Sequence, residues 1–153
     1  MISPGYRLRS SQPPHPNPNP QNDTAFSWYE TGFTIQTPGY TAYMLNMTSG
    51  TWLTPNDSSR YVWTHQLLVV VPVSYNPEYA STGALWITGG DVGDSNPSET
   101  DEDVLVCASL ATDTGTICSV LYQVPAQPII FSSDPQRRSR SEDAAVAWSW
   151  LRE

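Results

Sequence analysis

The sequence predicts an α/β fold whose sheet begins with antiparallel strands and continues with parallel strands flanked by helices. Residues 40–47 alternate between two faces, as a strand with one covered face does. Three later runs, THQLLVVVPV, ALWITGG and TICSVLYQVP, are apolar without alternation, and helix start and stop signals separate the second from the third. Antiparallel strands followed by alternating strands and helices indicate a mixed α/β sheet.

The antiparallel start depends on a period of two and on a turn signal. One face of residues 40–47 carries Tyr40, Ala42, Met44 and Asn46, and the other carries Thr41, Tyr43, Leu45 and Met47. The letters TSG then precede a second short apolar stretch, TWL. This pattern predicts a hairpin whose turn lies at Ser49 and Gly50.

The three apolar runs are predicted to be central strands of the sheet. Each run is apolar on both faces, which is typical of strands that helices cover on both sides. Sheets of this kind join parallel strands through crossover helices. We therefore expect a helix after ALWITGG and another after TICSVLYQVP.

The first helix is predicted over residues 101–112, with Ser98 or Thr100 as its N-cap. SETD and TDED both match a capping box, and the acidic side chains that follow suit the positive end of a helix dipole. Gly115 stands where a C-terminal stop is expected. Much of the acidic run after ALWITGG is thus explained by the start of a helix.

The second helix is predicted to follow RRSRSED, with Ser141 as its cap. Ala144, Ala147, Trp148 and Leu151 fall on one face at helical spacing. Neither Gly, Asn nor Pro closes this helix, and a crossover helix exists to join two strands. We therefore expect the domain over residues 25–153 to be incomplete.

Residues 1–24 contrast with the rest of the chain. They contain SQPPHPNPNPQNDT, in which alternating proline disfavours helix and removes backbone donors. We predict a disordered Pro/Asn-rich tail there, with His15 solvated. The first residues, MISPGYRLRSSQ, lack the apolar segment of a secretory signal, and no run of the chain is long and apolar enough to span a bilayer.

Charge excludes several functions. The net charge is −8, and all seven basic residues are arginine. Nucleic acid is therefore not expected as a partner, because phosphate binding needs clustered positive charge. The absence of lysine also excludes Schiff-base chemistry and the lysine of a P-loop.

Several ordered blocks of the sequence resemble one known family. The blocks are YTAYMLNMTSGTWLTPNDSSRYVWTHQLLVVVP, ALWITGG, TGTICSVLYQVPAQPIIFSSD and RSRSEDAAVAWSW, over about residues 25–153. They resemble the PhoPQ-activated pathogenicity-related protein family, which includes autocrine proliferation repressor-like proteins. The resemblance implies the N-terminal part of a larger, secreted, α/β-hydrolase-like domain. It leaves two functions open: acyl transfer on an ester or amide, or non-catalytic recognition of a cell-surface partner.

The end of ALWITGG is the candidate oxyanion loop. In hydrolases of this architecture a strand-to-helix loop supplies a backbone N–H to the oxyanion hole, and glycine allows close approach of the substrate. Gly89 and Gly90, with the amide of Asp91, stand where such a loop is expected. The alternative is a tight strand exit that needs glycine only for its backbone conformation.

No catalytic residue is expected within this chain. The fold places its nucleophile, acid and histidine in the order Ser, Asp or Glu, His, and the chain contains no G-x-S-x-G. His65 precedes every position where the base would lie, and its alternation with Trp63 and Leu67 in a strand indicates a structural role. The resemblance implies that these catalytic residues lie beyond Glu153.

No cofactor or metal is predicted. Asp91, Asp94 and Asn96 have some calcium-loop character, but the glycine and the distal glutamate of an EF-hand are missing and Pro97 interrupts the spacing. The GGDVG stretch lacks the context of a nucleotide-binding fingerprint.

The two cysteines and three sequons bear on export. Cys107 and Cys118 can pair if the chain is exported; we expect two free, buried thiols, because the sequence does not show the close approach that a disulfide needs. Candidate glycosylation sites are Asn22, Asn46 and Asn56, and they become glycan sites only in a secretory pathway.

Two further clusters are open to two interpretations. Arg137, Arg138 and Arg140 can dock an anion, but we expect a solvated loop that balances the nearby acids Asp134, Glu142 and Asp143. Trp63, Trp86, Trp148 and Trp150 can form an aromatic binding surface, but we expect core packing.

Overall fold

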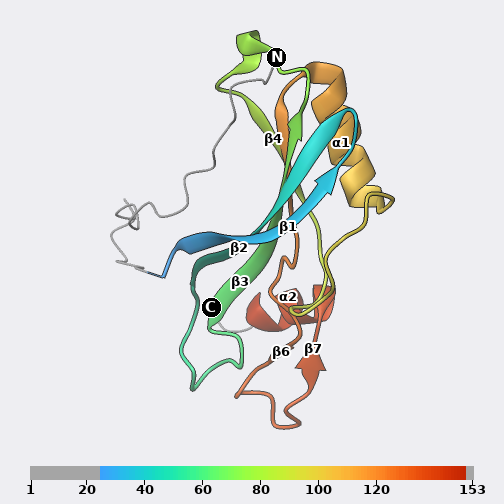
Figure 1. Ribbon diagram of the computed structural model, residues 1–153. Helices are drawn as coiled ribbons and strands as arrows, with labels where there is room; N and C mark the ends of the chain where they lie inside the picture. Colours follow the sequence, from blue (N-terminus) through green and yellow to red (C-terminus); the bar gives the residue numbers. More distant parts are fainter. Residues whose placement is uncertain (1–24, 151–153) are drawn as a thin grey trace.

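A computed structural model describes residues 25–150, and its main feature is one five-stranded mixed sheet (Figure 1). The strands of this sheet are β1 (Ser27–Gln36), β2 (Tyr40–Thr51), β3 (Val62–Pro72), β4 (Gly83–Ile87) and β5 (Ile117–Leu121). The remaining elements are a 3-10 turn, η1 (Pro77–Tyr79), the helices α1 (Glu102–Thr114) and α2 (Glu142–Trp150), and a small ribbon of β6 (Ile129–Ile130) and β7 (Ser139–Arg140). The predicted tail, residues 1–24, lies outside the described residues.

The strand order is β1-β2-β3-β5-β4. β1, β2, β3 and β5 pair antiparallel in succession, whereas β4 pairs parallel to β5. The parallel pair is joined through α1, which is the crossover that a parallel pair requires. The prediction of an α/β fold with an antiparallel start is confirmed.

The predicted hairpin turn at Ser49 and Gly50 is wrong. β2 continues through both residues to Thr51, and its register with β3 shifts between Thr48 and Gly50. Ser49 is thus the extra residue of a β-bulge. The residues that suggested a turn form this bulge, and β2 continues to pair with β3 beyond it. The connection to β3 comes afterwards, over residues 52–61.

The prediction of three central strands is correct for β3 and β5 and wrong for β4. Among residues 25–150, β4 pairs only with β5 and forms an edge of the sheet. Its Leu85 and Ile87 are 58% and 57% exposed. The apolar run correctly indicates a strand, but the composition of one segment does not say which other segment covers it.

The predicted end of helix α1 is correct, but its predicted start is not. Its N-cap is Asp101, not Ser98 or Thr100, and the Asp101 carboxylate accepts from the amide and hydroxyl of Ser98. Gly115 ends the helix as predicted, with φ of 71°. A Cβ on Gly115 would lie 2.8 Å from Cβ of Asn76, so both backbone conformation and space require glycine there.

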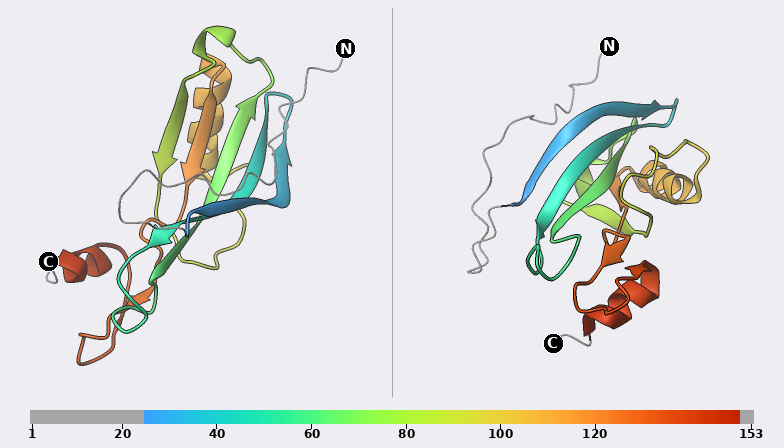
Figure 2. Two further views of the ribbon diagram at one scale, coloured as in Figure 1. Left: turned by 90° about the vertical axis from the view of Figure 1, so that its left-hand side faces the viewer. Right: turned by 90° about the horizontal axis from the view of Figure 1, so that it is seen from below.

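The main core lies between α1 and the sheet. Figure 2 shows α1 lying along one face of the sheet. Its buried face carries Val104, Cys107, Ala108 and Ala111, which pack with Ala42, Met44, Leu68, Val70, Cys118 and Val120 from the strands. Small side chains on the helix let it approach the sheet closely, and burial of this apolar surface stabilises the fold.

A second, smaller core lies at the other end of the sheet, where α2 packs on β6 (Figures 1 and 2). It contains Ile129, Phe131 and Ala145, with Trp52, Trp63 and Trp148 packed against them. The predicted face of α2 is only partly correct. Ala145 is buried, whereas Ala144 and Ala147 are exposed, and Leu151 lies outside the described residues. The spacing of apolar residues alone therefore did not predict which face of this short helix is buried.

Cys107 and Cys118 form a disulfide, so the expectation of free thiols is wrong. One cysteine lies on α1 and the other on the strand that follows it, and their Cα atoms are 5.4 Å apart. The two residues are 0% and 1% exposed. Packing of a helix on the next strand brought together two residues whose approach the sequence did not reveal.

Removing this disulfide is predicted to destabilise the protein by about 3 kcal/mol, the chain-entropy value for a loop of this length. The crosslink spans 11 residues of sequence. The test is urea denaturation of the Cys107→Ala/Cys118→Ala variant beside the wild type. Dithiothreitol should lower the wild-type midpoint and leave the double variant unchanged. An unchanged wild-type midpoint in reductant would contradict the prediction.

Candidate functional site

The glycine loop follows β4 and is fixed by Gln123. The backbone amide of Gln123 donates to the carbonyl oxygen of Gly89 at 2.8 Å, and its side-chain amide donates to the carbonyl oxygen of Asp91 at 3.2 Å. Gln123 therefore holds both ends of the Gly89–Gly90–Asp91 segment, the predicted oxyanion loop.

Gln123 is buried and also contacts β3. It is 4% exposed and has φ of 64°, a left-handed conformation that few non-glycine residues adopt. Its side-chain oxygen accepts from the amide of Gln66 at 3.2 Å, and its carbonyl oxygen lies 3.0 Å from Nδ1 of His65. No local sequence pattern signals this role, because these partners of Gln123 lie more than 30 residues away.

The amide of Asp91 is already engaged in a turn. It donates to Oδ2 of Asp94 at 2.7 Å, and the amide of Asp94 donates back to the carbonyl oxygen of Asp91 at 3.1 Å. Gly90 has φ of +108°, and a Cβ there would lie 3.2 Å from the same Asp94 oxygen. The turn therefore requires glycine at residue 90, and the Asp94 carboxylate occupies the donor that the sequence suggested for an oxyanion.

The start of α2 is attached to the same loop by Gln127. Its side chain accepts from the amide of Glu142 at 2.6 Å and donates to the Glu142 carboxylate at 2.7 Å. Its carbonyl oxygen accepts from the amide of Val92 at 2.7 Å. The Glu142 carboxylate thereby lies 3.2 Å from where a Cβ of Gly89 would stand. The sequence analysis missed Gln127 and considered Glu142 only as an acid that balances the nearby arginines.

His65 is buried and both of its ring nitrogens have partners. Nδ1 lies 3.0 Å from the carbonyl oxygen of Gln123 and 3.3 Å from that of Tyr122, and Nε2 lies 2.9 Å from Oγ of Ser49. Burial lowers the pKa of His65 below 6.5, although its bonds to the two carbonyls act in the opposite direction. Both ring nitrogens of this buried imidazole therefore have partners.

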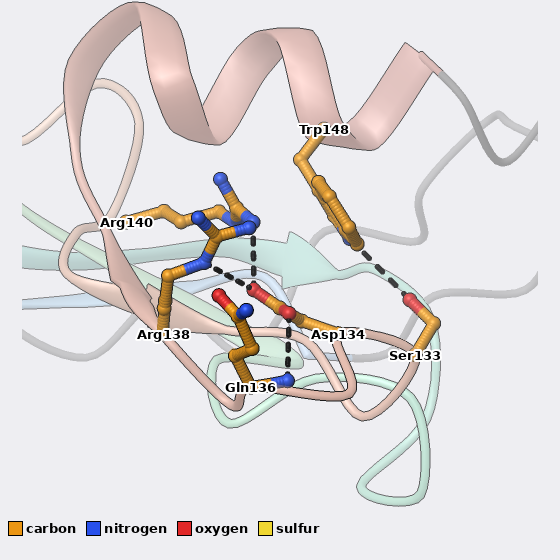
Figure 3. Close-up of polar contacts among 6 residues, drawn as sticks. All are labelled: Ser133, Asp134, Gln136, Arg138, Arg140 and Trp148. Carbon is orange, nitrogen blue, oxygen red and sulfur yellow. Dashed lines mark hydrogen bonds and ion pairs between the residues drawn. The ribbon is translucent and has the colours of Figure 1, made fainter.

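Arginine side chains gather around one buried carboxylate rather than around an open anion site (Figure 3). Asp134 is 1% exposed; its Oδ2 lies 2.6 Å from Nη2 of Arg140 and 3.3 Å from Nε of Arg138. Its Oδ1 accepts from the amide of Gln136 at 3.0 Å. The guanidinium of Arg140 stacks 3.9 Å from the ring centroid of Trp148. These contacts fix the loop that precedes α2.

The expected balancing of this arginine cluster by nearby acids holds for Asp134. Burial by itself raises the pKa of Asp134, but bonds from Gln136, Arg140 and Arg138 together lower it from 3.8 to about 2. Of the four tryptophans considered in the sequence, Trp63 and Trp148 pack against the second core as expected. Trp86 and Trp150 are 44% and 75% exposed, and Trp86 donates to the Asp103 carboxylate at 2.8 Å.

An apolar hollow of about 400 Å³ lies beside the second core. Trp52, Trp63, Phe131 and Trp150 supply its aromatic lining, and Ala145 and Val146 of α2 supply aliphatic surface. The hollow suits an apolar or aromatic group, because aromatic and aliphatic side chains make up most of its lining.

The sequons lie in different surroundings. The side-chain amide of Asn46 donates to the hydroxyl of Tyr29 at 2.7 Å, and the residue is partly buried. Asn56 is exposed in the connection between β2 and β3, so it is the more accessible acceptor. Asn22 lies outside the described residues.

Residues 25–150 contain neither a side-chain cluster of the metal-binding kind nor a membrane-spanning helix. No group of three or more His, Cys, Asp or Glu side chains is gathered there as a metal site would require. No helix in that range is long and apolar enough to cross a membrane.

Together, the fold and the loop define a mixed α/β domain with a glycine loop between a parallel strand and its crossover helix. Comparison with known proteins then identifies the family. The chain belongs to the PhoPQ-activated pathogenicity-related protein family, whose model matches residues 19–152.

A curated relative is the "Autocrine proliferation repressor protein A" of Dictyostelium discoideum. It is 32% identical over 130 residues, which are 84% of this chain and 24% of that protein. The chain thus spans about a quarter of the length of the relative. No solved structure matches the chain.

The Asp134 cluster predicts an acid-dependent loss of stability. Because the folded pKa of about 2 is below the unfolded value, ionised Asp134 stabilises the fold above about pH 4, and this contribution is lost as the pH falls toward 2. Asp134→Asn should lower the melting temperature by about 5 °C at pH 7. The measurement is thermal unfolding followed by circular dichroism between pH 2 and pH 7.

The matched control is Asp113→Asn, which removes the same charge from an exposed position. The melting curves of the Asp134 variant and the wild type should converge near pH 2, and the control should follow the wild type throughout. A constant difference between Asp134→Asn and wild type at every pH would contradict the assignment.

Proposed function

We propose that this chain forms the N-terminal part of an α/β-hydrolase-like domain that acts on an ester or amide by acyl transfer. One observation carries the proposal. The parallel strand β4 leads directly into the glycine loop and then into α1, which is the strand, loop and helix order that supplies an oxyanion-hole amide in such hydrolases. The strand order, with β4 outside β5 and a preceding antiparallel strand, supports the same architecture.

The backbone of the glycine loop would stabilise negative charge on the substrate oxygen. A peptide N–H needs no side chain to do this, and glycine lets the substrate approach without a Cβ in the way. Gly89 and Gly90 are the proposed donors. The Asp91 amide would join them only after the Asp94 carboxylate, now 2.7 Å away, leaves it.

The nucleophile, acid and histidine would lie on the part of the protein beyond Glu153. Within residues 25–150, β4 forms an edge of the sheet with Leu85 and Ile87 exposed, and this supports continuation of the sheet on that side. A nucleophile on a turn after the next parallel strand would face the glycine loop, because the C-terminal ends of parallel strands meet at one edge.

Secretion is part of the same proposal. The disulfide between Cys107 and Cys118 fits an oxidising compartment, and the resemblance to the family implies export. Exposed Asn56 would then be the glycan acceptor among the described residues.

A second candidate is a non-catalytic secreted factor that uses the same scaffold for recognition. The Dictyostelium relative is named a proliferation repressor, which favours this candidate. The aromatic hollow beside α2 offers a surface for an apolar group of a cell-surface partner. The Asp91 amide already donates to the Asp94 carboxylate, so it does not serve as an oxyanion donor in this arrangement. This contact also favours the recognition factor.

The first prediction of the hydrolase proposal concerns size. An antibody against DPQRRSRSEDAAVAWSWLRE should detect a native protein several times heavier than 16.9 kDa in its source. The reason is that the proposed catalytic residues need a longer domain. A native band at 16.9 kDa would remove the hydrolase proposal and leave the recognition factor.

The second prediction concerns the loop. Purified native-length protein should hydrolyse activated esters such as p-nitrophenyl butyrate, and Gly90→Ala should reduce kcat/KM at least about tenfold by displacing the amides of the loop. Gly93→Ala is the matched control: its φ is +103°, close to that of Gly90, but a Cβ there meets nothing within 4 Å.

Both variants place a Cβ on backbone of positive φ and should each lose on the order of 1–3 kcal/mol of stability. The Gly90 variant also crowds Asp94, so the activities are compared between folded proteins. Equal activities of the two variants would remove the oxyanion role from Gly90. A folded native-length protein without any ester turnover would favour the recognition factor.

A further inference from the structure

Ser49 and His65 form a hydrogen-bonded pair at the bulge of β2. Ser49 Oγ lies 2.9 Å from Nε2 of His65, and Ser49 is exposed whereas His65 is 4% exposed. We propose that this pair is a nucleophilic centre of the chain itself, in which Ser49 accepts an acyl group from an activated, uncharged ester and His65 is the general base.

The bonds of His65 fix which nitrogen is the base. Nδ1 faces the carbonyl oxygens of Gln123 and Tyr122, which only accept hydrogen bonds, so Nδ1 carries the hydrogen. Nε2 of the neutral ring then has a free lone pair directed at Ser49. The serine hydroxyl donates to it at 2.9 Å, whereas the carbonyl oxygen of Trp63 lies farther away at 3.5 Å, and a serine bonded to a base in this way is an activated nucleophile.

The orienting group in this pair is the backbone carbonyl of Gln123 instead of a carboxylate. Gln123 is held by its own bonds to Gly89, Asp91 and Gln66, so the carbonyl has a fixed position. Burial also keeps the imidazole in its neutral form at pH 7, because it lowers the pKa of His65. A neutral, oriented imidazole is the state that a general base requires.

The register of β2 and β3 explains why Ser49 can reach the histidine. His65 is paired with Met47, and side chains two positions apart lie on the same face of a strand, so Ser49 lies diagonally across from the ring. Ser49 is also the extra residue of the bulge, a feature that is common beside functional sites.

A cavity of about 360 Å³ is lined by His65 and by Thr48, the residue before Ser49, and the acyl donor would enter it beside the pair. Tyr29, Asn46, Thr64, Gln66 and Gln123 contribute hydroxyl and amide groups to its lining, and among the described residues no Asp, Glu or Arg side chain lines it. An uncharged donor with hydrogen-bonding groups fits this lining better than an ionised one, because burying an unpaired charge is costly. Tyr29 is the titratable neighbour of His65 in the cavity.

The reaction balances without a cofactor. The Ser49 hydroxyl proton moves to Nε2 of His65 while Oγ bonds to the ester carbonyl carbon. When the tetrahedral adduct collapses, the bond from carbon to the leaving oxygen breaks and the proton passes from Nε2 to the departing alcohol. Ser49 then carries the acyl group as an ester, and the imidazole is again neutral.

The test is labelling of the protein with a fluorophosphonate probe, followed by peptide mass spectrometry. The expected label is on Ser49 of the wild type and absent from Ser49→Ala. Ser81→Ala is the matched control, because Ser81 is an exposed loop serine. His65→Gln should slow labelling of Ser49 at least about tenfold. The rate should rise with pH to a plateau, with a midpoint below 6.5.

Mapping the label separates this inference from the proposed hydrolase function. A label on Ser49 supports the pair, and a label on a serine beyond residue 153 in a longer native form supports the hydrolase proposal alone. An unlabelled Ser49 in folded wild-type protein overturns the inference, whatever the variants do. Equal labelling of Ser49 in wild type and in folded His65→Gln would also overturn it, because the serine would then react without its base.

Discussion

The architecture around the candidate site depends on the buried position of Gln123. This residue follows β5, and it bonds to the glycine loop through its backbone amide and side chain, to β3 through its side-chain oxygen, and to His65 through its carbonyl oxygen. Its polar groups are removed from water, so each must have a partner inside the protein. The end of β5, the loop after β4 and the bulge of β2 are thereby held in one arrangement.

The two ends of the sheet are stabilised by different means. At one end, α1 buries small apolar side chains against the strands, and the disulfide links it covalently to β5. At the other, a small aromatic core supports α2, and the Asp134 cluster orders the loop before it. The glycine loop connects these ends, because Gln123 holds it from the sheet and Gln127 attaches it to the start of α2.

Two kinds of chemistry are therefore compatible with one chain. The glycine loop supplies backbone donors but no nucleophile within residues 25–150, so its proposed role needs more of the protein. The Ser49–His65 pair is the proposed nucleophile and base, at a bulge of β2 that is connected to Gln123 through His65. The role proposed for the glycine loop is drawn in part from family membership. The role proposed for the Ser49–His65 pair is inferred only from distances in the fold.

The sequence by itself determined the class of fold, the strand-loop-helix order at Gly89 and Gly90, the helix stop at Gly115 and the family. These features are local, because period, turn residues and caps act within a few positions of the chain. Tertiary structure decided the edge position of β4, the bulge at Ser49, the pairing of Cys107 with Cys118 and the partners of Gln123 and Gln127. Each of these depends on which distant segments pack together, and no local pattern encodes that.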